Sequence, residues 1–119
     1  MSQKETREKI GEVQVADEVV AAVAGFAALE TDGVAQLASK FSDNFTMRNL
    51  YKGVHIDMQG VNVQVSLAII VKYGYSIPKV SSQVQEKVVS SIQNMIGLHV
   101  TKVDIRVAGV EPNTATANS

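Results

Sequence analysis

The chain has 119 residues, the length of a single domain. Its 11 basic and 12 acidic side chains nearly cancel, so no net charge would draw it onto nucleic acid or an anionic membrane. It has no cysteine, which excludes disulfides, a thiolate nucleophile and cysteine-based metal sites. The hydrophobic share of 45% favours an ordinary globular protein.

Both ends of the sequence are expected to lie outside the folded domain. Residues 1–10 are charged and polar, without the apolar core of a secretory signal, and predict a flexible arm. Residues 111–119 offer no large apolar side chain and predict a disordered tail. One domain over residues 11–110 remains. No apolar run in the sequence approaches the ~20 residues that cross a bilayer, so we expect a soluble protein without direct membrane insertion.

The first predicted elements are a strand and a helix. Glu12 to Val15 alternates polar and apolar residues, which is typical of a short strand. A helix then starts at Ala16 or Asp17, with acidic residues at the positive end of its dipole, and ends near Glu30. Its apolar face recurs at three- and four-residue spacing and comprises Val20, Val23, Ala24 and Ala27.

The middle of the chain predicts a hairpin. After the Asp32-Gly33 turn signal, residues 34–38 predict a short strand. Residues 39–52 have no clean period and are interpreted as a loop or an irregular helix. Alternation over 53–59 and again over 63–71, around a short turn with Gly60, indicates two antiparallel strands.

The last third predicts a long helix and a final strand. Ser76 is a candidate cap, and apolar residues at three- and four-residue steps predict a helix from Ile77 to Ile96 that Gly97 ends. Lys102 to Val107 alternates as a strand. Leu98 and Val100 are out of phase with it, which a bulge near Thr101 would reconcile.

The predicted order is β-α-(β)-β-β-α-β, where the bracketed strand is 34–38. Strands with one apolar side indicate a mixed or antiparallel sheet with both helices on one face. The predicted fold class is therefore an α+β two-layer sandwich whose second sheet face is polar and open.

Candidate chemistry is sparse. His55 and His99 stand in no metal-ligand spacing, and a solvated surface position is the simpler interpretation of each. Asp57 and Asp104 both alternate outward, so a carboxylate pair is conceivable, although charges on an open strand face usually only solvate it. No GxSxG elbow occurs. We therefore predict a protein that is not an enzyme, with no catalytic, cofactor-binding or metal-binding residues.

The sequence also lacks the motifs of phosphate-binding and nucleic-acid-binding proteins. No two glycines are two or three residues apart, which excludes the glycine-rich phosphate loops and the loop of KH domains. Lys72, Tyr73 and Tyr75 come near to a basic and aromatic patch, but rings covering the end of a strand explain them more simply. A small-molecule or nucleic-acid binder is thus the weakest of the non-enzymatic hypotheses.

One surface remains as a candidate contact area. Ala68 and Ile70 alternate outward on the long strand, and Lys72 and Tyr73 follow them. Isolated exposed apolar residues are normal, yet an uncovered sheet is also a common association surface. We take Ala68, Ile70, Lys72 and Tyr73 as the predicted interaction surface.

Several segments, in order and with matching spacing, resemble the alkaline shock protein (Gls-type) family of Gram-positive envelope stress proteins. The resemblance covers about the whole of residues 11–110, except for residues 39–51. The segments that carry it are Gly11–Val20, Ala27–Val34, Lys52–Val54, Val71–Gly74, Val84–Val88, Met95–Leu98 and Val103–Val110.

The resemblance implies a non-enzymatic protein of cell-envelope homeostasis. Such proteins are cytoplasmic, self-associate, and can gather at the inner face of the membrane through a membrane-anchored partner. The resemblance also leaves an alternative, a regulator of fatty-acid or lipid synthesis that binds a metabolic enzyme. It brings no catalytic or ligand residues and no cofactor with it.

Overall fold

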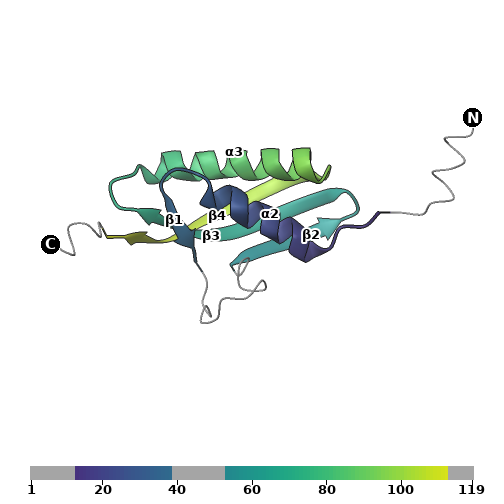
Figure 1. The fold of residues 1–119 in the computed structure, drawn as a ribbon, viewed down its shortest axis with the longest axis horizontal. Helices are drawn as coiled ribbons and strands as arrows, with labels where there is room; N and C mark the ends of the chain where they lie inside the picture. The colour runs from purple at the N-terminus through teal and green to yellow at the C-terminus, as the bar shows by residue number, and fades with distance from the viewer. Residues whose placement is uncertain (1–12, 39–52, 113–119) are drawn as a thin grey trace, which may run out of the picture.

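The computed structural model describes residues 13–38 and 53–112 (Figure 1). Two helices and four strands follow in chain order: α2 (Asp17–Leu29), β1 (Val34–Leu37), β2 (Val54–Gln59), β3 (Asn62–Lys72), α3 (Ile77–Met95) and β4 (His99–Glu111). Both helices lie on the same side of the sheet, as Figure 1 shows. The predicted α+β two-layer sandwich is confirmed.

Strand β3 is the centre of the sheet. Along one edge it pairs antiparallel with β2 through its first half and with β1 through its second half. Along the other edge it pairs with β4 in parallel over the whole length from Asn62 to Lys72. The sheet is therefore mixed, one of the two forms that the sequence predicted. The parallel pair needs a crossover, and α3 supplies it.

The core lies between the sheet and the two helices. Helix α2 contacts β1, β2 and β3, whereas α3 contacts β4 and the flank of α2. The inward side chains of β3 are almost completely buried, and so is one row of valines and an isoleucine on α3. Those residues are Val63, Val65, Leu67, Ile69 and Val71 on β3, and Val80, Val84, Val88 and Ile92 on α3. The buried core residues are Val, Ala, Ile and Leu, without an aromatic side chain. The helices therefore fill the core by packing close to the sheet.

The predicted turns and caps are largely confirmed. Gln59 pairs with Asn62, which leaves a two-residue hairpin turn whose first residue, Gly60, has a φ of 63°, as type II′ turns require. At α3 the Ser76 hydroxyl accepts from the Lys79 amide at 3.4 Å, and Gly97 ends the helix with a φ of 85°.

Strand β4 is longer than the predicted 102–107. It begins at His99 and ends at Glu111, because two register shifts against β3 let the out-of-phase residues join the ladder. The first shift falls at Thr101, where a bulge was predicted, and the Thr101 hydroxyl donates to the Val63 carbonyl at 3.3 Å. The second shift falls at Ala108 and was not foreseen.

The predicted first strand is wrong for the residues that can be judged. Val13 to Ala16 form no strand, and Glu12 lies outside the described residues. Alternating residues form a strand only where the backbone can pair with a neighbouring strand. This segment instead leads directly into α2, on the side of the sheet that the helices cover. Val15 packs against the core from there, while Val13 is 93% exposed. The prediction for residues 39–52 also lies outside the described residues.

Gly33 should be the least replaceable turn residue. Its φ is 94°, and an added Cβ would lie 2.6 Å from Val80 Cγ2 and 2.7 Å from Tyr75 Cδ2. Gly33→Ala should therefore lower the free energy of unfolding by about 2–4 kcal/mol, combining left-handed strain with overpacking. Urea denaturation measures the loss.

Gly74→Ala is the matched control. Gly74 has a φ of 95° but nothing within 4 Å of an added Cβ, so only backbone strain of about 1–2 kcal/mol should appear. Equal losses for the two variants would show that the contact with Val80 and Tyr75 is not tight.

Candidate interaction surfaces

The sheet face that the helices leave uncovered is polar, as the sequence predicted. We call it the open face. Charged and amide side chains dominate on all four strands, and the register places them in rows across β3. The residues on the open face are Gln36, His55, Asp57, Gln59, Asn62, Gln64, Ser66, Ala68, Ile70, Lys72, Lys102, Asp104 and Arg106. A partner on this face would meet hydrogen-bonding groups and charges more than apolar surface.

The predicted contact residues are partly brought together. Ala68, Ile70 and Lys72 lie in line on the open face of β3, whereas Tyr73 belongs to the turn after it and is 69% exposed. Ala68 and Ile70 are partly buried. A Cβ on Gly109 would lie 3.3 Å from Ile70 Cδ1, so the isoleucine lies close over the neighbouring strand. The apolar surface available there is small.

The candidate chemical groups stay apart. His55 and His99 are both exposed, as predicted. Asp57 lies opposite Gln64 and Asp104 opposite Ser66, on the strands that flank β3, so about 10 Å of sheet separates their backbones. Asp104 instead lies 3.6 Å from Lys102 Nζ. The conceivable carboxylate pair is therefore not formed, and no group of three or more His, Asp or Glu within 13–38 and 53–112 could hold a metal ion.

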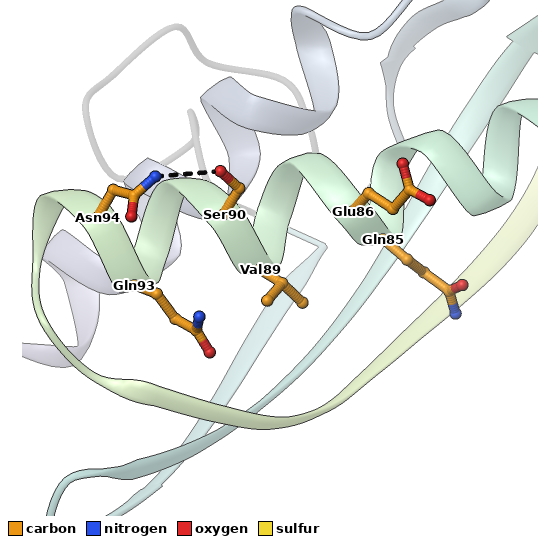
Figure 2. Close-up of a pocket in the computed structure, with 6 residues that line it drawn as sticks. All are labelled: Gln85, Glu86, Val89, Ser90, Gln93 and Asn94. Carbon is orange, nitrogen blue, oxygen red and sulfur yellow. Dashed lines mark hydrogen bonds between the residues drawn. The ribbon is translucent and has the colours of Figure 1, made fainter.

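A shallow hollow of about 450 Å³ runs along the outer side of α3 (Figure 2). In Figure 2, Gln85, Val89 and Gln93 point to one side of the helix and Glu86, Ser90 and Asn94 to the other. Asn94 Nδ2 donates to Ser90 Oγ at 3.2 Å within the second row. Because the six residues all belong to one helix, the hollow is a gap between side-chain rows. A ligand pocket instead encloses most of its ligand.

A further apolar surface of the described residues lies on α2, where the sequence predicted no site. The helix buries Val20, Ala24, Ala27 and Ala28 against the core, as predicted in part. Its opposite side is also apolar, and three of its side chains are 50%, 49% and 39% exposed. We call this side the α2 outer stripe, which consists of Val19, Ala22, Phe26 and Leu29; the three exposures are those of Val19, Phe26 and Leu29 in that order. Val23, which the sequence predicted for the core face, packs against the core.

A signal for the α2 outer stripe is present in the sequence. From Val19 to Leu29 the helix contains no polar side chain at all. A helix that is apolar around its whole circumference is normally buried on all sides, yet the described residues cover α2 on one side only. The sequence prediction considered only the core-facing residues of this helix and therefore missed the additional apolar residues on its outer side. No helix in the described part of the chain is long and apolar enough to cross a membrane.

The free edge of β4 is a further unusual feature. Within the described residues, this 13-residue strand pairs only with β3. Its apolar side chains facing α3 are only partly buried, whereas their neighbours on β3 are 0–3% exposed. On the free side, the Val103 carbonyl accepts a hydrogen bond from Gln85 Nε2 of α3 at 3.0 Å. A side chain thus occupies a position where an amide of another strand would bind.

Solved structures share this α+β arrangement. A triple variant of the MamM CTD has a TM-score of 0.51 and 15% identity, covering 79% of this chain and 95% of that one. The nickel form of another MamM CTD variant also has a TM-score of 0.51, with 14% identity, and covers 79% of this chain and 99% of that one. At such low identity the likeness establishes the fold alone.

Sequence comparison establishes the family. Residues 5–112 match the alkaline shock protein 23 family, which has a cell envelope-related function. The chain belongs to this family. It is 34% identical to YqhY of Bacillus subtilis (strain 168) over 109 residues, covering 88% of this chain and 81% of YqhY. It is 38% identical to YloU of the same organism over 112 residues, covering 89% and 93%. The resemblance stated from sequence is confirmed.

Two neighbouring isoleucines test the one-sided burial of the sheet. Ile69 is 0% exposed in the core, so Ile69→Ala should lower the free energy of unfolding by about 3–4 kcal/mol. Ile70 is half-exposed on the open face, so Ile70→Ala should cost about 1 kcal/mol. Chemical denaturation of both variants provides the comparison, and equal losses would mean that the open face is covered in the purified protein.

Proposed function

We propose that this chain is a non-enzymatic cell-envelope homeostasis protein that acts by self-association and by contacts with other proteins near the cytoplasmic membrane. The family supplies the link to the envelope. The observation that carries the proposed mode of action is the α2 outer stripe, an apolar surface that no other described element covers.

Phe26 is the largest side chain of the α2 outer stripe. A phenylalanine presents roughly 200 Å² of surface, and half of it is exposed here, on a ridge continuous with Val19 and Leu29. Covering about 100 Å² of apolar surface contributes about 2.5 kcal/mol. An aromatic side chain between smaller apolar ones is the usual composition of an association hot spot.

The partner that fits this stripe is an apolar helix face of a membrane-anchored protein. Exposed residues at positions i, i+7 and i+10 of one helix form a ridge that packs against a second helix. The chain has a formal net charge of −1 and gains little from anionic headgroups, which favours a protein over lipid as the membrane contact.

The four predicted contact residues contribute a smaller part of the proposed protein contact. Ala68, Ile70, Lys72 and Tyr73 combine a small apolar centre with an exposed cation and an exposed phenol. Such a mixture suits the polar rim of a protein contact better than its centre. We therefore assign the main contact energy to the α2 outer stripe and a smaller share to the open face.

Affinity purification from the native cell, with crosslinking, tests the proposal. Phe26→Gln removes the aromatic anchor from a half-exposed position and should leave the fold intact. The variant should recover at least tenfold less of a membrane-anchored partner than the wild-type chain does. The recovered proteins are quantified by mass spectrometry.

The control is Val61→Ser. Val61 is 65% exposed in the β2–β3 turn and does not belong to the α2 outer stripe, so its loss should leave recovery unchanged. Equal recovery with wild type and Phe26→Gln would contradict the role of the α2 outer stripe. Recovery of a lipid-synthesis enzyme in place of an envelope protein would favour the metabolic alternative.

A further inference from the structure

The backbone hydrogen bonds of β3 determine which groups of β4 are free. The Ala68 amide donates to Gly53 and the Ala68 carbonyl accepts from Ala38, while the Lys72 amide donates to Gly33. Even-numbered residues of β3 therefore direct their backbone groups toward β1 and β2. Because alternate residues of a strand face opposite edges, the odd-numbered ones face β4.

The pairing register then orients β4. Val103, Ile105 and Val107 lie opposite Val65, Leu67 and Ile69, which are odd-numbered residues of β3. In a parallel pair of strands, two opposite residues alternate in their hydrogen bonding. If the residue on β3 points its amide and carbonyl toward β4, then the opposite residue on β4 points its amide and carbonyl away from β3. The amides and carbonyls of Val103, Ile105 and Val107 consequently point to the free edge. The bond from Gln85 to the Val103 carbonyl agrees with this orientation.

The sequence of this edge is symmetric in chemical type. Ile105 is the midpoint of β4, with Asp104 and Arg106 on either side and then Val103 and Val107. A two-fold axis through Ile105 places Asp104 of each copy opposite Arg106 of the other copy, which gives two such pairs in one dimer. It also places Val103 opposite Val107 of the second copy. The two register shifts, at Thr101 and Ala108, leave the stretch between them regular.

We propose that two copies of this chain join through antiparallel pairing of their β4 edges, with the two-fold axis at Ile105. Residues 103, 105 and 107 form the hydrogen-bonded pairs, with the Val107 amide of the second copy replacing Gln85 Nε2 at the Val103 carbonyl. Asp104 and Arg106 form ion pairs across the seam on the open face. The two sheets become one continuous sheet with all four helices on one side. This inference rests on the proposed self-association and assigns it a surface and a register.

Charge decides between this register and its neighbours. An axis at Asp104 would place Asp104 opposite itself and Lys102 opposite Arg106, both like-charged. An axis at Arg106 would place that guanidinium opposite itself. An axis at Val103 would pair Asp104 with Lys102 but would bring the shifted residue Thr101 into the ladder. Only the axis at Ile105 combines opposite charges with a regular backbone.

Burial favours the same edge. Val103, Ile105 and Val107 are only partly buried beside α3, so a second strand would cover apolar surface as well as pair backbone groups. The opposite edge of the sheet is divided between β2, with 6 residues, and β1, with 4 residues. Among the residues that the structure describes, that edge has no unbroken strand as long as β4.

Charge reversal tests the register. Asp104→Arg should place two guanidinium groups opposite each other across the seam, and Arg106→Asp should place two carboxylates opposite each other. Each variant alone should dimerise at least tenfold more weakly than wild type in sedimentation equilibrium, since two pairs are reversed in each dimer. An equimolar mixture restores both opposite-charge pairs and should recover wild-type affinity. Circular dichroism confirms that each variant is folded.

A cysteine experiment locates the seam independently. The chain has no cysteine, so an introduced one has no competitor. Ile105→Cys should form a disulfide-linked dimer on oxidation, because hydrogen-bonded antiparallel pairs hold their Cα atoms about 5.5 Å apart. Ile56→Cys, at a partly buried position on β2, is the control and should form no disulfide-linked dimer under the same oxidation.

Two results would overturn the proposal in distinguishable ways. A wild-type chain that is monomeric at every concentration would contradict self-association itself, and with it this inference; a strand from another protein would then be the occupant of the edge. A dimer that tolerates both charge reversals, or that crosslinks through a cysteine at position 56 and not at position 105, would contradict the β4 seam alone.

Discussion

The parallel pairing of β3 with β4 is the constraint on which the rest of this structure depends. A parallel neighbour needs a crossover, so α3 must return across the sheet and cover β4. Because β2 and β1 divide the other edge of β3 between them, β4 becomes the one long edge strand of the described sheet. The backbone groups of Val103, Ile105 and Val107 therefore have no strand partner within the described sheet, and Gln85 of α3 binds the Val103 carbonyl.

The helix layer follows from the same arrangement. With α3 over β4, α2 must cover β1, β2 and the nearer part of β3, and its alanines and glycine let it lie close to the sheet. A helix of small apolar residues has little polar surface with which to solvate its outer side. The α2 outer stripe results from this composition, so the helix that completes the core also carries an apolar ridge that the described chain does not cover.

Much of this fold could be predicted from the sequence, because its signals are local. The period of Val80, Val84, Val88 and Ile92 defines α3, and the phase change at Thr101 locates a bulge. The false strand at Val13–Val15 had the same local signal, but no sheet edge lies beside it. Pairing partners depend on distant segments, so the free edge of β4 could not be predicted from β4 alone. The predicted surface at Ala68 and Ile70 was placed on the correct face, but both side chains are partly buried, and Ile70 lies against Gly109 of the neighbouring strand.

Amide hydrogen exchange as a function of protein concentration tests the account most directly, because it reports on individual backbone groups. The amides of Asp104 and Arg106 face β3 and should be protected at every concentration. The amides of Val103, Ile105 and Val107 face the free edge and should exchange rapidly when the chain is dilute. They should become protected as the concentration rises and copies associate. Protection of these three amides that is already complete in dilute monomer, or that never changes while the chain associates, would contradict a β4 edge that is free in one copy and paired between two.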